Sequence, residues 1–131
     1  MINQEICVNF ALKIIKGMFK DLEYNDTNNL NLIYDIEFEK LCNYLNRDDI
    51  PKELTYTLAC RVAGKELETN LIFKENQSMA NLEVLNNILE LKEYETTIKY
   101  SSKNDFFNFY VKKLVDYGKE ELMRWRLVVW K

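Results

Sequence analysis

Histidine is absent from this chain of 131 residues. Its absence removes the commonest general base and metal ligand of proteins, and it excludes Ser-His-Asp and Cys-His catalytic sets. The chain also has no Walker loop and no dinucleotide-binding fingerprint. Asp48 and Asp49 are adjacent carboxylates that could bind Mg²⁺, but no third ligand stands nearby in sequence, and capping of the next helix explains Asp49. The sequence therefore predicts a protein that is not an enzyme, with no catalytic residue, metal site or cofactor.

Glycine and proline are scarce, with three and one copies, which argues against a turn-dense all-β fold and favours long helices. No apolar run approaches the roughly 18–20 residues that a membrane-spanning helix needs. Lys13 and Lys16 lie inside the first apolar stretch, which is wrong for a signal peptide. We therefore expect a single domain over residues 1–131, made in the cytoplasm and without a membrane partner.

The chain also lacks a basic excess, because its formal net charge is −3. Proteins that neutralise duplex phosphates usually carry a clear excess of Lys and Arg, so specific nucleic-acid binding is not predicted. Cys7, Cys42 and Cys60 are an odd number without paired spacing, and each lies on or beside an apolar helical stripe. They are interpreted as small buried hydrophobic residues in a reducing compartment rather than as disulfide partners or metal ligands.

Four stretches carry apolar residues at helical spacing. They predict helices over about 3–23, 29–45, 51–73 and 105–126. The first helix should have a broad apolar face, on which Ile6, Phe10, Ile14 and Met18 recur every four residues with Cys7, Ala11, Ile15 and Leu22 alongside. The acidic residues of the second and third helices, including Glu37 and Glu66, are expected to face water.

One stretch has a period of two instead, because Thr96, Ile98 and Tyr100 alternate with polar residues. It could pair with residues 89–92 in a short β-hairpin near 88–100. The predicted fold class is thus mainly α: a four-helix bundle with an N-terminal helix over about 3–23, a core over about 29–130, and a possible hairpin.

Two groups of residues are candidates for an interface. The small residues of the third helix allow another helix to approach closely, either within the core or from a neighbouring subunit. The aromatic and cationic C-terminus should be docked, because chain ends fray otherwise and because Trp and Arg are enriched at interface hot spots. Its docking surface is either the protein's own core or a partner. The candidate interface residues are Ala59, Ala63, Gly64, Arg124, Trp125, Arg126, Val128 and Trp130.

Three patterns in the sequence carry a family resemblance. The first is a helix–turn–helix junction with Tyr44, Asn46, Ile50, Pro51 and Leu54. The second is the candidate hairpin with Leu91, Lys92, Thr96, Ile98 and Tyr100. The third is the last helix with Leu114, Tyr117, Gly118, Leu122, Arg124, Arg126 and Trp130. Together they resemble the small head–tail connector (adaptor) proteins of tailed bacteriophages, over roughly residues 30–130.

The sequence departs from the family pattern at two places and has one helix that the pattern does not include. Tyr94 and Glu95 stand where the family's hairpin has Gly and Asp, and Arg124-Trp125-Arg126 stands where it has Tyr-Arg-Arg. The N-terminal helix is not part of the pattern.

The resemblance implies a structural virion protein in the neck of the particle, present in the host cytoplasm during assembly. Such proteins are mostly helical and form a ring beneath the portal protein, with twelve copies expected from portal symmetry. The ring extends the DNA channel, lets DNA pass without specific binding, and docks the stopper or tail-completion protein. A neck protein of a contractile-tail bacteriocin would have the same sequence features. The alternative from a different class is a small regulatory or host-interaction protein that binds one partner through its C-terminal aromatic helix.

Overall fold

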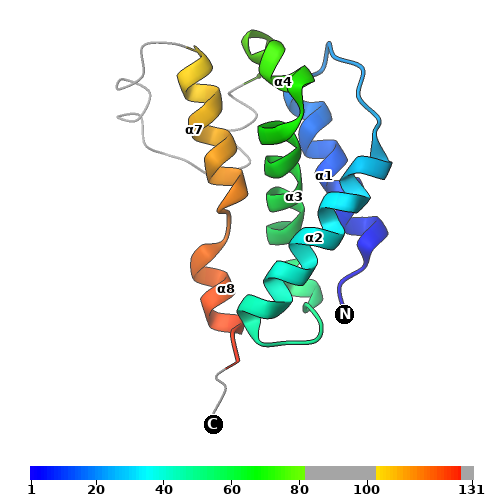
Figure 1. The fold of residues 1–131 in the computed structure, drawn as a ribbon, viewed down its shortest axis with the longest axis vertical. Coiled ribbons are helices and arrows are strands. Elements are labelled where there is room, and N and C mark those ends of the chain that lie inside the picture. Colours follow the sequence, from blue (N-terminus) through cyan, green and yellow to red (C-terminus); the bar gives the residue numbers. More distant parts are fainter. Residues whose placement is uncertain (82–102, 128–131) are drawn as a thin grey trace.

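The structure is a computed structural model that describes the backbone of residues 1–81 and 103–127. These residues are mainly helical, as predicted (Figure 1). The longer helices are α1 (Gln4–Met18), α2 (Thr27–Leu45), α3 (Thr55–Thr69) and α7 (Lys103–Val115), and the shorter ones are α4 (Leu71–Glu75) and α8 (Lys119–Trp125). Single 3₁₀ turns cover Lys52–Leu54 and Gln77–Met79. The possible hairpin near 88–100 lies outside the described residues.

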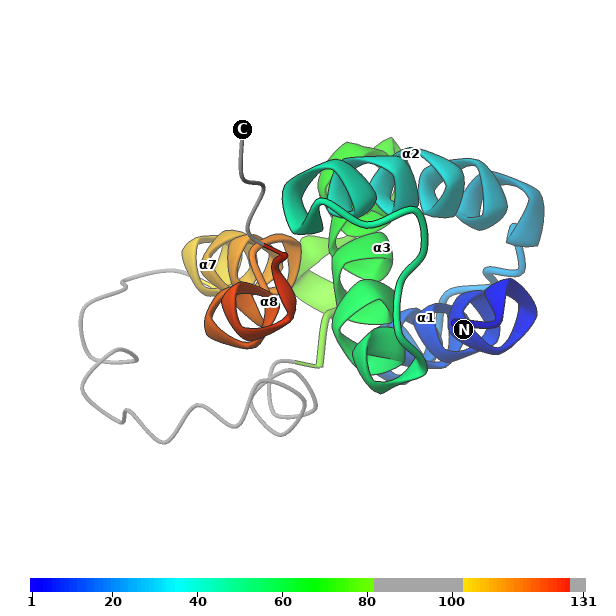
Figure 2. The ribbon, with the colours of Figure 1, turned by 90° about the horizontal axis from the view of Figure 1, so that it is seen from below.

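Helix α3 is the centre of the molecule, with α1 and α2 on one side and α7 on the other (Figures 1 and 2). A helix that is apolar on several faces must be surrounded, and α3 meets that condition. Its residues without any exposed surface are Leu58, Ala59, Cys60, Val62, Ala63, Glu66 and Leu67. Every long helix therefore packs against the same buried element.

Side-chain caps begin α1, α2 and α4, and several helix boundaries differ from the predicted ones. Asn3 accepts the Ile6 N–H at the start of α1, and Asp26 accepts the Asn29 N–H at the start of α2. α1 ends at Met18 instead of near residue 23. The expectation that Asp49 caps the third helix was wrong: a 3₁₀ turn precedes α3, and neither start has a side-chain cap bond.

The predicted third helix is divided at Asn70. This residue has an extended backbone, and its side-chain oxygen accepts the Ile72 N–H to start α4. The break turns Phe73 into the interior, where its ring centroid lies 5.0 Å from that of Phe19 and 5.1 Å from that of Tyr24. This aromatic cluster closes the end of the core that carries α4.

The predicted last helix is divided at Gly118, which has a positive φ of 73°. A Cβ at this position would lie 2.6 Å from Cγ2 of Thr57 and would also be strained by the backbone conformation. Gly118 therefore allows the chain to pass close to α3 and start a new helix, α8, in a different direction.

The buried face of α1 is narrower than the broad apolar face that the sequence predicted. Ile14 and Met18 are buried, but Ile6 is 58% exposed and Phe10 is 39% exposed. The interior side of the helix is formed by Cys7, Val8, Ala11, Ile14, Ile15 and Met18. The predicted apolar face contained all of these except Val8, but it was too broad, because it also included the exposed Ile6 and Phe10.

The expectation that Glu37 and Glu66 face water was also wrong. Glu66 has no exposed surface, and its carboxylate accepts hydrogen bonds from the Tyr24 hydroxyl and the Asn29 amide. These donors stabilise the buried carboxylate, and the burial and the Glu66 bond raise the pKa of Tyr24 well above its usual range. The network ties the α1–α2 connection to α3.

Two of the three cysteines behave as the sequence predicted. Cys7 and Cys60 have no exposed surface, whereas Cys42 is partly exposed. Burial raises the pKa of both Cys7 and Cys60 to about 12, and the nearby Cys60 contributes to the shift at Cys7. Both thiols therefore stay protonated and unreactive at neutral pH. Among the described helices, none combines the length and the apolar character needed to cross a membrane.

Candidate partner interface at the C-terminal arm

The small residues of α3 lie inside the chain. Ala59 and Ala63 have no exposed surface, and a Cβ on Gly64 would lie 2.7 Å from the Val115 nitrogen and 2.8 Å from Cβ of Leu114. The helix that approaches closely is therefore α7 of the same chain. Of the two explanations that the sequence left open, packing within the core is the one seen in the single chain. These three residues are no longer candidates for an exposed interface.

The C-terminal arm, defined here as Trp125–Leu127, lies across the end of α2. Asn46 ends α2 in the left-handed conformation, with a φ of 56°, and thereby leaves the Leu45 carbonyl open to another partner. The Leu127 N–H donates to that carbonyl at 2.8 Å, and the Asn46 side-chain amide donates to the Leu127 carbonyl at 2.7 Å. The described part of the C-terminus is thus docked on its own domain.

Two cation–aromatic contacts accompany these hydrogen bonds. The guanidinium of Arg47 lies 5.7 Å from the centre of the Trp125 ring, and its Nε–H donates to the Trp125 carbonyl at 2.8 Å. The guanidinium of Arg126 lies 5.0 Å from the centre of the Tyr44 ring. Such contacts contribute about 0.5–1 kcal/mol each at exposed sites. They orient the arm without burying it.

The outer side of this region is open to a partner. Met123 is 64% exposed and Leu127 is 47% exposed, and Arg124, Arg126 and Tyr44, which Arg126 contacts, are exposed as well. Apolar, aromatic and arginine side chains in one exposed group are the composition of interface hot spots. Of the predicted interface residues, Arg124 and Arg126 belong to this exposed group, and Trp125 is half-buried against Arg47. Val128 and Trp130 lie outside the described residues.

Sequence reasoning missed the residues that hold the arm. The sequence did not connect Asn46 or Arg47 with the C-terminus, because their bonds to the arm span 81 and 78 residues. An asparagine directly after a periodic helix was the available signal, because Asn tolerates the left-handed conformation that ends helices.

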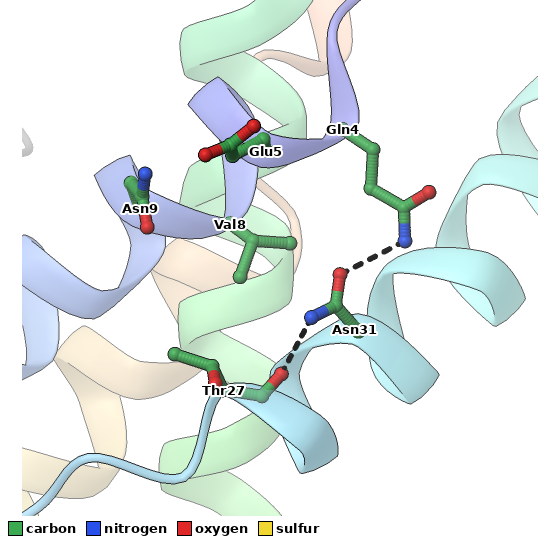
Figure 3. A pocket seen from close by; sticks show the side chains of 6 residues that line it. All are labelled: Gln4, Glu5, Val8, Asn9, Thr27 and Asn31. Atoms are coloured by element: carbon green, nitrogen blue, oxygen red, sulfur yellow. Dashed lines mark hydrogen bonds between the residues drawn. The ribbon is translucent and has the colours of Figure 1, made fainter.

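A second surface feature is a shallow polar groove between α1 and α2, with a volume of about 500 Å³ (Figure 3). The Gln4 amide donates to the side-chain oxygen of Asn31 at 2.9 Å, and the Asn31 amide donates to the Thr27 carbonyl at 2.8 Å. These amide and carbonyl groups satisfy one another and join the start of α1 to the N-terminal half of α2. Glu5 is the charged side chain among the residues that line the groove.

The described residues contain no cluster of His, Cys, Asp and Glu side chains that could hold a metal ion. Asp48 is exposed and Asp49 is half-buried in the turn before α3. The chain's comparison with known proteins gives no relative: no family model, no curated protein and no solved structure matches it.

Proposed function

We propose that this protein is a head–tail connector of a tailed bacteriophage, or of a related contractile-tail particle. In this proposal it is a structural protein of the virion neck, without enzymatic activity. Twelve copies form a ring beneath the portal protein, extend the DNA channel, and dock the stopper or tail-completion protein. DNA passes the ring without specific binding, in keeping with a net charge of −3.

The observation that carries the proposal is the exposed apolar and cationic surface of the C-terminal arm. It lies at the end of the molecule opposite to α4 (Figure 1), so it can contact a partner without disturbing the aromatic cluster at the other end. A closed ring also needs two different surfaces on each subunit. Leu32 and Ile36 of α2, which are 59% and 49% exposed, supply a second exposed apolar pair.

The test is assembly on the portal protein encoded in the same genome. The mixture should give rings on the portal by electron microscopy, whereas the isolated chain should scatter light as a monomer or a weak oligomer at micromolar concentration. Contacts of modest area are marginal alone and become sufficient when repeated on a template. A tight symmetric dimer that ignores the portal would contradict the proposal and favour the regulatory or host-interaction protein.

Two matched variants locate the contact. Met123→Glu in α8 combined with Leu127→Glu in the arm places charge at two exposed positions of this surface, and should abolish ring formation while the chain stays folded. Leu71→Glu combined with Met79→Glu makes the same pair of changes at positions that are 66% and 42% exposed near α4, and should leave rings intact. Equal effects of the two would show that the arm is not the portal contact.

A further inference from the structure

A cleft of about 270 Å³ lies between α2, α3 and the α7–α8 junction. The buried leucines Leu41 and Leu122 form its inner wall, and charged or aromatic side chains form the rest. The residues that matter for its chemistry are Glu37, Lys40, Tyr44, Arg61, Asp116 and Lys119.

Arg61 is the cation placed deepest in this cleft. Its Nε–H donates to the Tyr117 carbonyl at 2.9 Å, which fixes the plane of the guanidinium. Within residues 1–81 and 107–127, no carboxylate lies within ion-pair distance of Arg61, and its two Nη groups have no hydrogen-bond partner. An arginine stays charged in proteins, so a half-buried guanidinium with free N–H groups is a site for an anion.

The charges around Arg61 leave an excess of positive charge. Glu37 pairs with Lys40 at 3.8 Å, so the unpaired groups of the cleft are Arg61, Lys119 and Asp116. Burial lowers the pKa of Arg61, and the negative charges of Asp116 and Glu37 offset only part of that effect. A further carboxylate would compensate the burial of the guanidinium and could form two parallel bonds with it.

From this geometry we infer that the cleft binds a glutamate or aspartate side chain on an acidic segment of a partner protein. Its volume lies below the roughly 300–1,000 Å³ of small-molecule sites, so one side chain fits better than a whole ligand. Tyr44 lines the cleft and also contacts Arg126 of the arm, so a protein held at the arm lies next to the cleft. The inference stands on the cleft alone and does not require the connector assignment.

The experiment measures binding of a fluorescein-labelled hexaglutamate peptide to the full chain at low salt. The peptide should bind and shift the methyl resonances of Leu41 and Leu122, and the matched hexaglutamine peptide should not. Arg61→Gln should weaken binding by about tenfold or more, because it removes hydrogen bonds to a charged group. Lys119→Glu changes an exposed residue and should weaken binding about threefold or more.

The control is Lys74→Glu, which makes the same charge change at an exposed position of α4, away from the cleft. It should change the affinity by less than about twofold. Should Arg61→Gln fail to fold, Lys119→Glu against Lys74→Glu decides the question. Three results would overturn the inference: equal binding of hexaglutamine, an equal loss in Lys74→Glu, or glutarate binding as tightly as the peptide, which would indicate a site for small anions.

Discussion

The two ends of the C-terminal half are attached to the rest of the molecule by different means. α7 crosses α3 at Gly64, where the helices approach so closely that a single added carbon would collide with the Val115 backbone. The arm beyond α8 is attached instead by hydrogen bonds to the end of α2 and by cation–aromatic contacts, with Leu127 still 47% exposed. Close packing of buried groups stabilises the α3–α7 contact, whereas hydrogen bonds and cation–aromatic contacts stabilise the contact between the arm and α2. Substitutions at the crossing should therefore affect the whole fold, whereas substitutions at the arm should act locally.

The largest effect is expected for Gly64→Ala. The added methyl group meets backbone atoms of α7, which cannot move aside as a flexible side chain would, so overpacking should cost about 3 kcal/mol of unfolding free energy. Chemical denaturation measures the loss. The neighbouring Lys65→Ala is the control, because a change at a half-exposed position should stay within about 0.5 kcal/mol. A stable Gly64→Ala variant would show that the α3–α7 crossing is looser than these distances indicate.

A smaller loss is expected at the buried carboxylate of Glu66. Glu66→Met keeps most of the side-chain volume but leaves the Tyr24 hydroxyl and the Asn29 amide without their acceptor, which should cost about 2 kcal/mol. Adding Tyr24→Phe removes the hydroxyl that has lost its acceptor, so the double variant should recover about 1 kcal/mol of unfolding free energy. The measurement is a double-mutant cycle by denaturation. Additive losses would mean that the hydroxyl and the carboxylate are not coupled.

The buried thiols should also make the stability of the fold depend on pH. The pKa values of Cys7 and Cys60 are raised to about 12 from a reference of 9.0, so the folded state holds these protons longer than the unfolded state. Their stabilisation is complete below the reference value and is lost as the pH rises from there toward 12. Between about pH 8.5 and 9.5 the two thiols together should cost about 1.4 kcal/mol of stability.

Denaturation at both pH values under reducing conditions tests this slope. Cys60→Ala removes one of the two titrating thiols and should roughly halve the loss. An unchanged slope in that variant would assign the pH dependence to other groups.

A contrast between the helices and the junctions that connect them explains what could be predicted from the sequence. Periodic apolar residues located α2 to within two residues of its start, because one strong stripe and one cap determine such a helix. The break at Gly118 was missed, because its requirement for a positive φ arises from the approach to Thr57 on another helix. The burial of Glu66 was missed for the same reason, since its partner Tyr24 is 42 residues away. Local patterns report helices, whereas their junctions depend on contacts between distant residues.

The candidate site was also predictable from local composition but not in its contacts with distant residues. Trp125 and Arg126 were identified from composition, because aromatic and arginine residues at a chain end require a docking surface. The identity of that surface was not predictable, since the left-handed turn at Asn46 creates the free carbonyl that the arm uses.

The smallest effect is expected at that turn, and it separates local from global attachment. Asn46→Gly preserves the left-handed backbone, because glycine adopts a positive φ at no steric cost, but it removes the amide that donates to the Leu127 carbonyl. The loss in global stability should be about 0.5–1 kcal/mol or less, as for one partly exposed hydrogen bond. Hydrogen exchange of the Leu127 amide should accelerate while that of the buried Leu58 amide stays unchanged, because local opening does not require global unfolding. Asn46→Ala is the matched variant: it removes the same bond and adds about 1–2 kcal/mol of backbone strain, so it should lose more global stability. If Asn46→Gly instead accelerated exchange equally at Leu58 and Leu127, the arm would belong to the cooperative interior, and it could not leave α2 to meet a partner without unfolding the protein.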